Sequence, residues 1–113
     1  MKVVYVAGPY STDNKAQQAQ FMQQAKDATL VLWTNGIAGL CPLTMTEHFA
    51  SLLSWERFLE TDCELLKRCD GVLFLPGWEK SKGCQEEWRL AVAKHKDIFY
   101  TIDELVFVWG QCS

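Results

Sequence analysis

Two acidic side chains of this chain, Asp62 and Glu87, occupy positions where a helix is normally apolar. Asp62 lies four residues after Phe58, and residues spaced by four share one face of an α-helix. Glu87 lies three residues after Cys84 and four before Ala91. Burial of a carboxylate raises its pKa and is typical of acid–base or nucleophilic sites. The structural alternative is that either side chain lies at an exposed helix edge, or that Asp62 pairs with a nearby basic residue.

A loop of Gly8, Pro9, Tyr10 and Ser11 directly follows a short apolar run. A glycine at the end of a strand lets a ligand approach the backbone closely, so we expect these four residues to line a binding site. The loop matches neither the dinucleotide-binding motif nor the Walker loop. Hydrolysis of nucleoside triphosphates and dinucleotide binding are therefore not indicated.

A second loop places Ser81 and Gly83 at the start of a predicted helix, with Lys82 between them. Free amides at a helix N-terminus, a hydroxyl and an ammonium group suit an anion such as a phosphate. The alternative is that Ser81 is an ordinary helix cap. Trp78, in the same loop, could stack on an aromatic ligand or serve as a lid or packing residue, and the sequence favours neither.

The elements that must position these residues alternate along the chain. We expect strands over residues 3–7, 37–41, 72–75 and 98–100, and helices over residues 14–35, 55–69, 81–94 and 102–109, with a less regular stretch over residues 43–54. This order predicts an α/β fold in one domain of residues 1–113: a doubly wound, flavodoxin-like three-layer sandwich with a parallel sheet of four to five strands. Ligands of such folds bind at the carboxyl ends of the strands, where the strand order reverses.

Composition excludes several classes of protein. The 113 residues are 49% hydrophobic and 22% charged, which is typical of a globular domain and not of a disordered chain. The net charge of −3 gives no indication of binding to a nucleic acid polymer. No apolar run approaches the about 20 residues of a membrane span, and the N-terminal run is too short for a signal peptide. We therefore expect a cytoplasmic protein without membrane contact.

The five cysteines form no CxxC pair, and their number is odd. With only two histidines in the chain, a zinc site is not expected, and reduced thiols are the simplest reading. The sequence indicates neither a metal nor a cofactor. The cysteines are Cys41, Cys63, Cys69, Cys84 and Cys112.

Taken together, these motifs resemble the nucleoside 2-deoxyribosyltransferase superfamily. The matching segments are VVYVAGPYS, the proline of LCPLT, TDCELLKRCDGVLFLPGWEKSKG and GCQEE, which together run from Lys2 to about Tyr100. The similarity is strongest to a small, largely uncharacterised branch whose members carry YVAGP and LPGW. The resemblance implies chemistry at the N-glycosidic bond of a nucleoside or a nucleoside 5′-monophosphate, either hydrolysis or transfer, in a homo-oligomer of two or more subunits.

The resemblance also implies a role for individual residues. Glu87, four residues after Gly83, is the expected nucleophile, and Tyr5 is expected to hold it. Asp62, eight residues before Asp70, is expected to work near the base. Ser81 is expected to contact the phosphate of a monophosphate substrate.

Cleavage of an N-glycosidic bond creates positive charge on the sugar and negative charge on the base. A carboxylate at the anomeric carbon stabilises the sugar, and a protonated carboxyl stabilises the departing base. Among the two carboxylates, Asp62 is expected to be the acid, because its apolar neighbours would keep it neutral. Two alternatives remain open: a nucleotide-binding or sensor module without turnover, and a redox protein that uses its cysteines.

Overall fold

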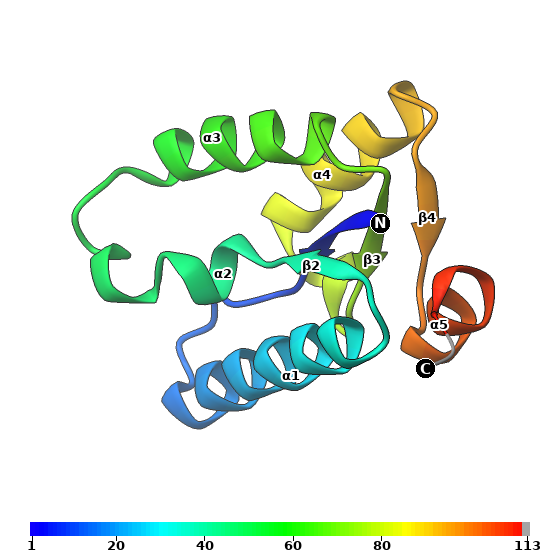
Figure 1. Ribbon diagram of the computed structural model, residues 1–113. Coiled ribbons are helices and arrows are strands. Elements are labelled where there is room, and N and C mark those ends of the chain that lie inside the picture. The colour runs from blue at the N-terminus through cyan, green and yellow to red at the C-terminus, as the bar shows by residue number, and fades with distance from the viewer. Residues whose placement is uncertain (112–113) are drawn as a thin grey trace.

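Four short strands form one parallel sheet in the structure, a computed structural model that describes residues 1–111. The strands are β1 (Val3–Ala7), β2 (Ala38–Leu40), β3 (Gly71–Phe74) and β4 (Asp97–Phe99). They lie in the order β2-β1-β3-β4, and every neighbouring pair is parallel. The predicted doubly wound, flavodoxin-like architecture is confirmed, with four strands (Figure 1).

Helices cover both faces of this sheet, which makes three layers (Figure 1). Helices α1 and α5 lie on one face, and α3 and α4 lie on the other. The helical elements are α1 (Lys15–Thr34), α2 (Pro42–Met45), η1 (Glu47–Phe49), α3 (Trp55–Lys67), η2 (Trp78–Lys80), α4 (Lys82–Ala93) and α5 (Ile102–Trp109). Within residues 1–111, none of the helices combines the length and the apolar character that crossing a membrane requires.

Local capping explains where several helices begin. The side chain of Asn14 accepts hydrogen bonds from the amides of Ala16 and Gln17 at the start of α1. Ser54 caps α3 in the same way, by accepting from the amide of Arg57 at 3.1 Å. At the other end of α1, Gly36 adopts a φ of 73°, a left-handed conformation that glycine tolerates without strain.

The structure differs from the sequence-based elements at several places, including the ends of β2 and β3, which each differ by one residue. The stretch over residues 43–54 was expected to be irregular, yet it contains α2 and η1; Pro42 stands in the first turn of α2, where its fixed φ favours a helix. Helix α3 ends at Lys67 rather than at residue 69, and β4 begins and ends one residue earlier than expected. None of these differences changes the order of the elements.

The alternation of side chains along β1 decides which layer receives a functional group. Val4 and Val6 enter the core beneath α1 and α5. Tyr5 and Ala7 enter the opposite core, which lies beneath α3 and α4. Because Tyr5 points toward the layer that carries both unusual carboxylates, the strand register itself brings a phenol to them.

Candidate active site

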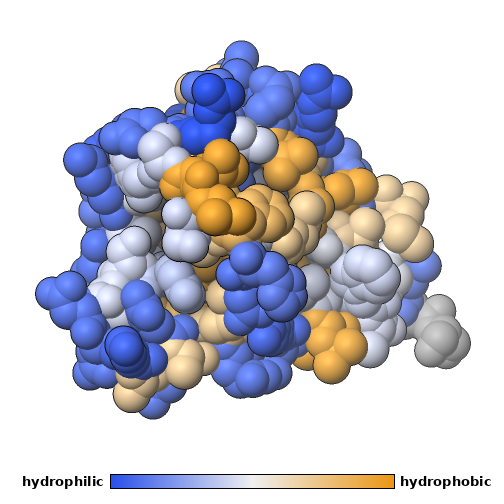
Figure 2. Space-filling view, turned by 90° about the vertical axis from the view of Figure 1, so that its left-hand side faces the viewer, coloured by the Kyte–Doolittle hydropathy of each residue, from blue (hydrophilic) through white to orange (hydrophobic). Residues whose placement is uncertain are grey.

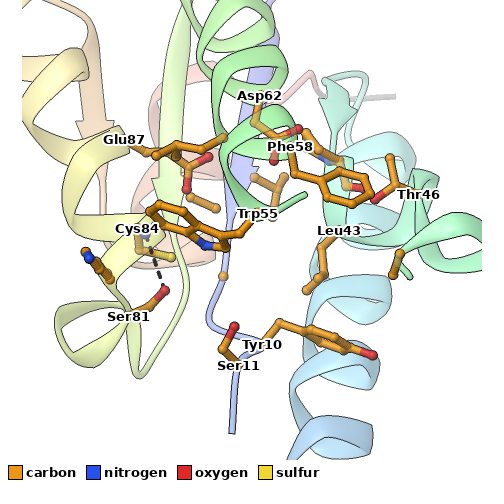
Figure 3. A pocket seen from close by; sticks show the side chains of 18 of the residues that line it. Tyr10, Ser11, Leu43, Thr46, Trp55, Phe58, Asp62, Ser81, Cys84 and Glu87 are labelled. Carbon is orange, nitrogen blue, oxygen red and sulfur yellow. Dashed lines mark hydrogen bonds between the residues drawn. The ribbon is translucent and has the colours of Figure 1, made fainter. Parts of the chain in front are cut away.

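A cavity of about 540 Å³ opens at the carboxyl end of β1. β2 and β3 flank β1 on opposite sides, so this end is the point where the strand order reverses. The walls come from β1 and the loop after it, from α2 and the segment that follows, from α3, and from the start of α4 (Figure 3). This cavity therefore lies at the place where the sequence predicts a ligand site.

Glu87 is the most deeply buried acidic group of the site, with 7% of its surface exposed. The hydroxyl of Tyr5 donates a hydrogen bond to Glu87 Oε2, and Tyr5 itself is 1% exposed. Burial raises the pKa of Glu87 to about 7; the hydrogen bond from Tyr5 lowers it, and the nearby charge of Asp62 raises it. Burial, followed by the charge of Glu87, raises the pKa of Tyr5 well above its ordinary value, so the phenol stays a donor.

Asp62 projects into the same cavity from α3, facing the helix that carries Glu87 (Figure 3). Its side chain is half-buried, and burial raises its pKa to about 6. The sequence-based expectation was that Asp62 would be the more neutral of the two carboxylates. In the structure burial raises the pKa of both carboxyls, and Glu87 is the more deeply buried of the two.

The start of α4 presents donors to the cavity. Ser81 Oγ accepts a hydrogen bond from the amide of Cys84 at 3.3 Å, so Ser81 caps the helix and also lines the cavity. A Cβ atom added to Gly83 would meet nothing within 4 Å, which leaves the first turn of the helix open toward the cavity. The amides of Lys82 and Gly83 lie in the first turn, where a helix supplies no acceptor of its own.

Most of the predicted site residues meet in this cavity, and two do not. The residues that line it are Tyr5, Gly8, Tyr10, Ser11, Asp62, Ser81, Gly83 and Glu87. Pro9 is buried outside the lining, and its Cγ lies 3.1 Å from where a Cβ of Gly77 would be. The role of Pro9 is therefore to pack the loop rather than to face a ligand.

Trp78 also lies away from the cavity. Its ring packs against Phe74, Trp88 and Tyr100 at centroid distances of 4.9, 6.2 and 5.7 Å. The sequence left open whether Trp78 stacks on a ligand or packs within the protein. These ring contacts favour packing. Asp70, the second aspartate of the predicted spacing, accepts a hydrogen bond from the amide of Val3 at 2.8 Å and lies outside the lining as well.

Sequence reasoning missed Trp55, the first residue of α3, as part of the site. Its ring lies between the two walls of the cavity (Figure 3). A signal was present, because Trp55, Phe58 and Asp62 follow the three- and four-residue spacing of one helix face. Several other lining residues, such as Leu43 and Thr46, come from the stretch that was expected to be irregular.

The cysteines of the described residues are four free thiols: Cys41, Cys63, Cys69 and Cys84. Burial raises the pKa of each of them, and that of Cys84 to about 12, so the reactive thiolate is disfavoured. This disfavours the redox alternative for these four; Cys112 lies outside the described residues. No three histidine, cysteine or acidic side chains within residues 1–111 are close enough together to hold a metal ion.

Solved structures with this architecture include enzymes that act on nucleosides. A 2-deoxyribosyltransferase from the psychrotolerant bacterium Bacillus psychrosaccharolyticus is 17% identical, with a TM-score of 0.61 over 85% of this chain and 69% of that one. A 2-deoxyribosyltransferase from Leishmania mexicana is 19% identical, with a TM-score of 0.59 over 87% of this chain and 62% of that one. At such identities the comparison shows a shared fold.

The expected resemblance to nucleoside 2-deoxyribosyltransferases is thus confirmed as structural similarity. No curated protein matches the chain. Residues 2–100 match the family model described as a domain of unknown function, DUF4406, and the chain therefore belongs to the DUF4406 family.

Proposed function

We propose that this protein breaks the N-glycosidic bond of a nucleoside 5′-monophosphate or nucleoside, by hydrolysis or by transfer, with Glu87 as the nucleophile. The observation that carries the proposal is the pairing of Glu87 with Tyr5 inside a cavity that also contains Asp62. Tyr5 holds Oε2 of the carboxylate, and no described residue donates a hydrogen bond to Oε1. That second oxygen is available to attack an anomeric carbon.

The reaction follows from these groups in two steps. Glu87 Oε1 forms a bond to C1′ while the C1′–N bond breaks, and the base leaves with the bonding electron pair and takes a proton from the Asp62 carboxyl. In the second step, water or another base attacks C1′ and releases the Glu87 carboxylate. The proton of the attacking molecule returns to Asp62. The net result is hydrolysis if the acceptor is water and transfer if it is a base.

Catalysis needs exactly one proton on the pair, and that proton must be on Asp62. Burial raises the pKa of Glu87 to about 7 and that of Asp62 to about 6, so the pair loses its two protons near neutral pH. The productive form is the one in which Asp62 carries the single proton and Glu87 is ionised. The phenol of Tyr5 favours the productive form, because its hydrogen bond stabilises the ionised Glu87.

The size and the donors of the cavity support a nucleotide as ligand. A volume of about 540 Å³ lies within the range of about 300–1,000 Å³ that small-molecule sites occupy. Ser81 and the open turn at Gly83 supply donors at the start of α4, one and a half turns before Glu87. A 5′-phosphate at the helix start would place the sugar beside Glu87.

A homo-oligomer is part of the same proposal. The segment from α2 to α3 exposes large apolar side chains outside the cavity lining: Met45 at 52%, Phe49 at 39% and Leu52 at 74%. Figure 2 shows apolar side chains gathered on the side of the molecule where this segment lies. We propose that a second copy of the chain covers them. Light scattering should give a multiple of 12.9 kDa, and Leu52→Asp should shift it toward one subunit.

The test of the reaction is release of free base from a panel of ribo- and deoxyribonucleoside monophosphates and nucleosides, followed by chromatography. Glu87→Gln should lower the rate about a thousandfold or more. The matched control is Glu86→Gln, because Glu86 pairs with Arg89 outside the cavity and should leave the rate unchanged.

Product that forms only when a second base is supplied would identify a transferase. If monophosphates raise the melting temperature but no base is released from any of them, the enzyme proposal fails and the binding-module alternative replaces it.

A further inference from the structure

Lys82 and Trp55 meet across the cavity from two different helices. Trp55 is the first residue of α3 and Lys82 is the first residue of α4. The Lys82 ammonium lies 5.5 Å from the centroid of the Trp55 ring, which is within cation–π range. Both side chains line the cavity and both are exposed to solvent. The pair therefore joins the helix of Asp62 to the helix of Glu87 at the mouth of the cavity.

Lys82 stands at an electrostatically unusual place. The first turn of a helix favours acidic side chains, because the N-terminus carries a partial positive charge. The first turn of α4 contains no acidic residue and has Lys82 instead. No carboxylate of residues 1–111 forms an ion pair with this ammonium, which instead faces the ring of Trp55. The ammonium and the helix N-terminus thus concentrate positive charge beside an open cavity.

We propose that Lys82 and Trp55 select nucleotides over nucleosides by exchanging partners when a ligand binds. The base stacks on the ring of Trp55, and the Lys82 ammonium leaves that ring for the 5′-phosphate. This inference rests on the substrate class proposed above. It assigns the discrimination between the two kinds of ligand to one side chain, Lys82.

The exchange is favourable only for a ligand that carries both an aromatic ring and an anion. An ammonium–phosphate hydrogen bond is stronger than a cation–π contact at an exposed site. Stacking of a base on an aromatic side chain replaces the contact that the ring loses. A nucleoside has to displace Lys82 without offering it a new partner, so the pair disfavours nucleosides in addition to favouring nucleotides.

The test is calorimetric binding in a Glu87→Gln background, which removes turnover. A nucleoside 5′-monophosphate, the matching nucleoside and ribose 5-phosphate serve as probes. Lys82→Ala should weaken binding of the monophosphate and of ribose 5-phosphate tenfold or more. The same variant should bind the nucleoside as tightly as before or about two- to fivefold more tightly, because the Trp55 ring no longer has to release Lys82. The matched control is Lys94→Ala, which removes an exposed charge just past the far end of α4. It should change the binding of none of the three probes.

Trp55→Leu should weaken the binding of the two base-containing probes about fivefold or more and leave the binding of ribose 5-phosphate unchanged. The inference is overturned if Lys82→Ala weakens the binding of nucleoside and monophosphate equally, or if it weakens the binding of neither. In both cases release of base by the wild-type protein would leave the proposed function standing. If no probe binds even with Lys82 and Trp55 intact, the proposed substrate class fails and this inference fails with it.

Discussion

The two cores on either side of the sheet differ in kind. The core beneath α1 and α5 contains only apolar side chains, among them Val4, Val6 and Leu73, which are at most 1% exposed. The core beneath α3 and α4 receives Tyr5 from the same strand and borders the buried Glu87. The first core has no buried acidic side chain at its edge, whereas the second borders a cavity with titratable groups at its wall. The division implies that stability resides mainly in the first core and chemistry in the second.

The largest effect expected from this division is a loss of stability when a side chain of the apolar core is shortened. Leu73→Ala, on β3, should lower the free energy of unfolding by about 2–5 kcal/mol, because it leaves a void in a packed interior. Urea denaturation measures this change. The rate of base release by the folded variant should stay within about twofold of the wild type. A rate that falls in parallel with stability would show that the two cores are not separable.

Glu87→Gln should have the opposite effects: it should increase the free energy of unfolding and remove activity. The pKa of Glu87 rises from its ordinary 4.5 to about 7 on folding, so the folded protein binds the extra proton between these two values. Its contribution is complete below pH 4.5 and is lost as the pH rises through 7. At pH 8 the variant should be more stable than the wild type by on the order of 3 kcal/mol. The difference should shrink toward pH 4.5; denaturation curves that stay parallel across this range would contradict the burial of an ionised Glu87.

Tyr5→Phe probes the phenol without changing the shape of the core. It should lower kcat about 10- to 100-fold, because the ionised form of Glu87 loses its donor and its pKa rises further. KM and the stability below pH 6 should change little. Kinetics over a range of pH values measures kcat and KM. An unchanged kcat, with folding verified by circular dichroism, would remove Tyr5 from the mechanism.

The smallest effect is the shape of the pH–rate profile. Activity should fall below about pH 6, where both carboxyls are protonated, and above about pH 7, where both are ionised. Asp62→Asn should remove the alkaline limb, because the remaining activity no longer depends on a protonated acid. Its acid limb should then report the titration of Glu87 alone, whose pKa is raised by burial. A wild-type profile that is flat from pH 5 to 8 would contradict this division of roles.

The sequence carries the information for the fold and for the members of the site. Strand–helix alternation predicts the sheet, and helical spacing identifies Asp62 and Glu87 as unusual, because both features depend on local periodicity. Which of the two is more deeply buried depends on how tightly α3 and α4 pack against β1, and periodicity does not contain that information. The same limit explains the tryptophans. Trp78 and Trp55 both stand near a helix start, and only tertiary packing sends one into an aromatic cluster and the other into the cavity.

The central claim, that Glu87 attacks the anomeric carbon, is tested most directly by trapping the intermediate. A nucleoside 5′-monophosphate with fluorine at C2′ should slow the second step, so the sugar stays on the enzyme as an ester. Mass spectrometry of the intact protein and of its peptides should then find the sugar phosphate on the peptide that contains Glu87. The account is contradicted if the adduct maps to another residue, or if Glu87→Gln forms the same adduct at the wild-type rate.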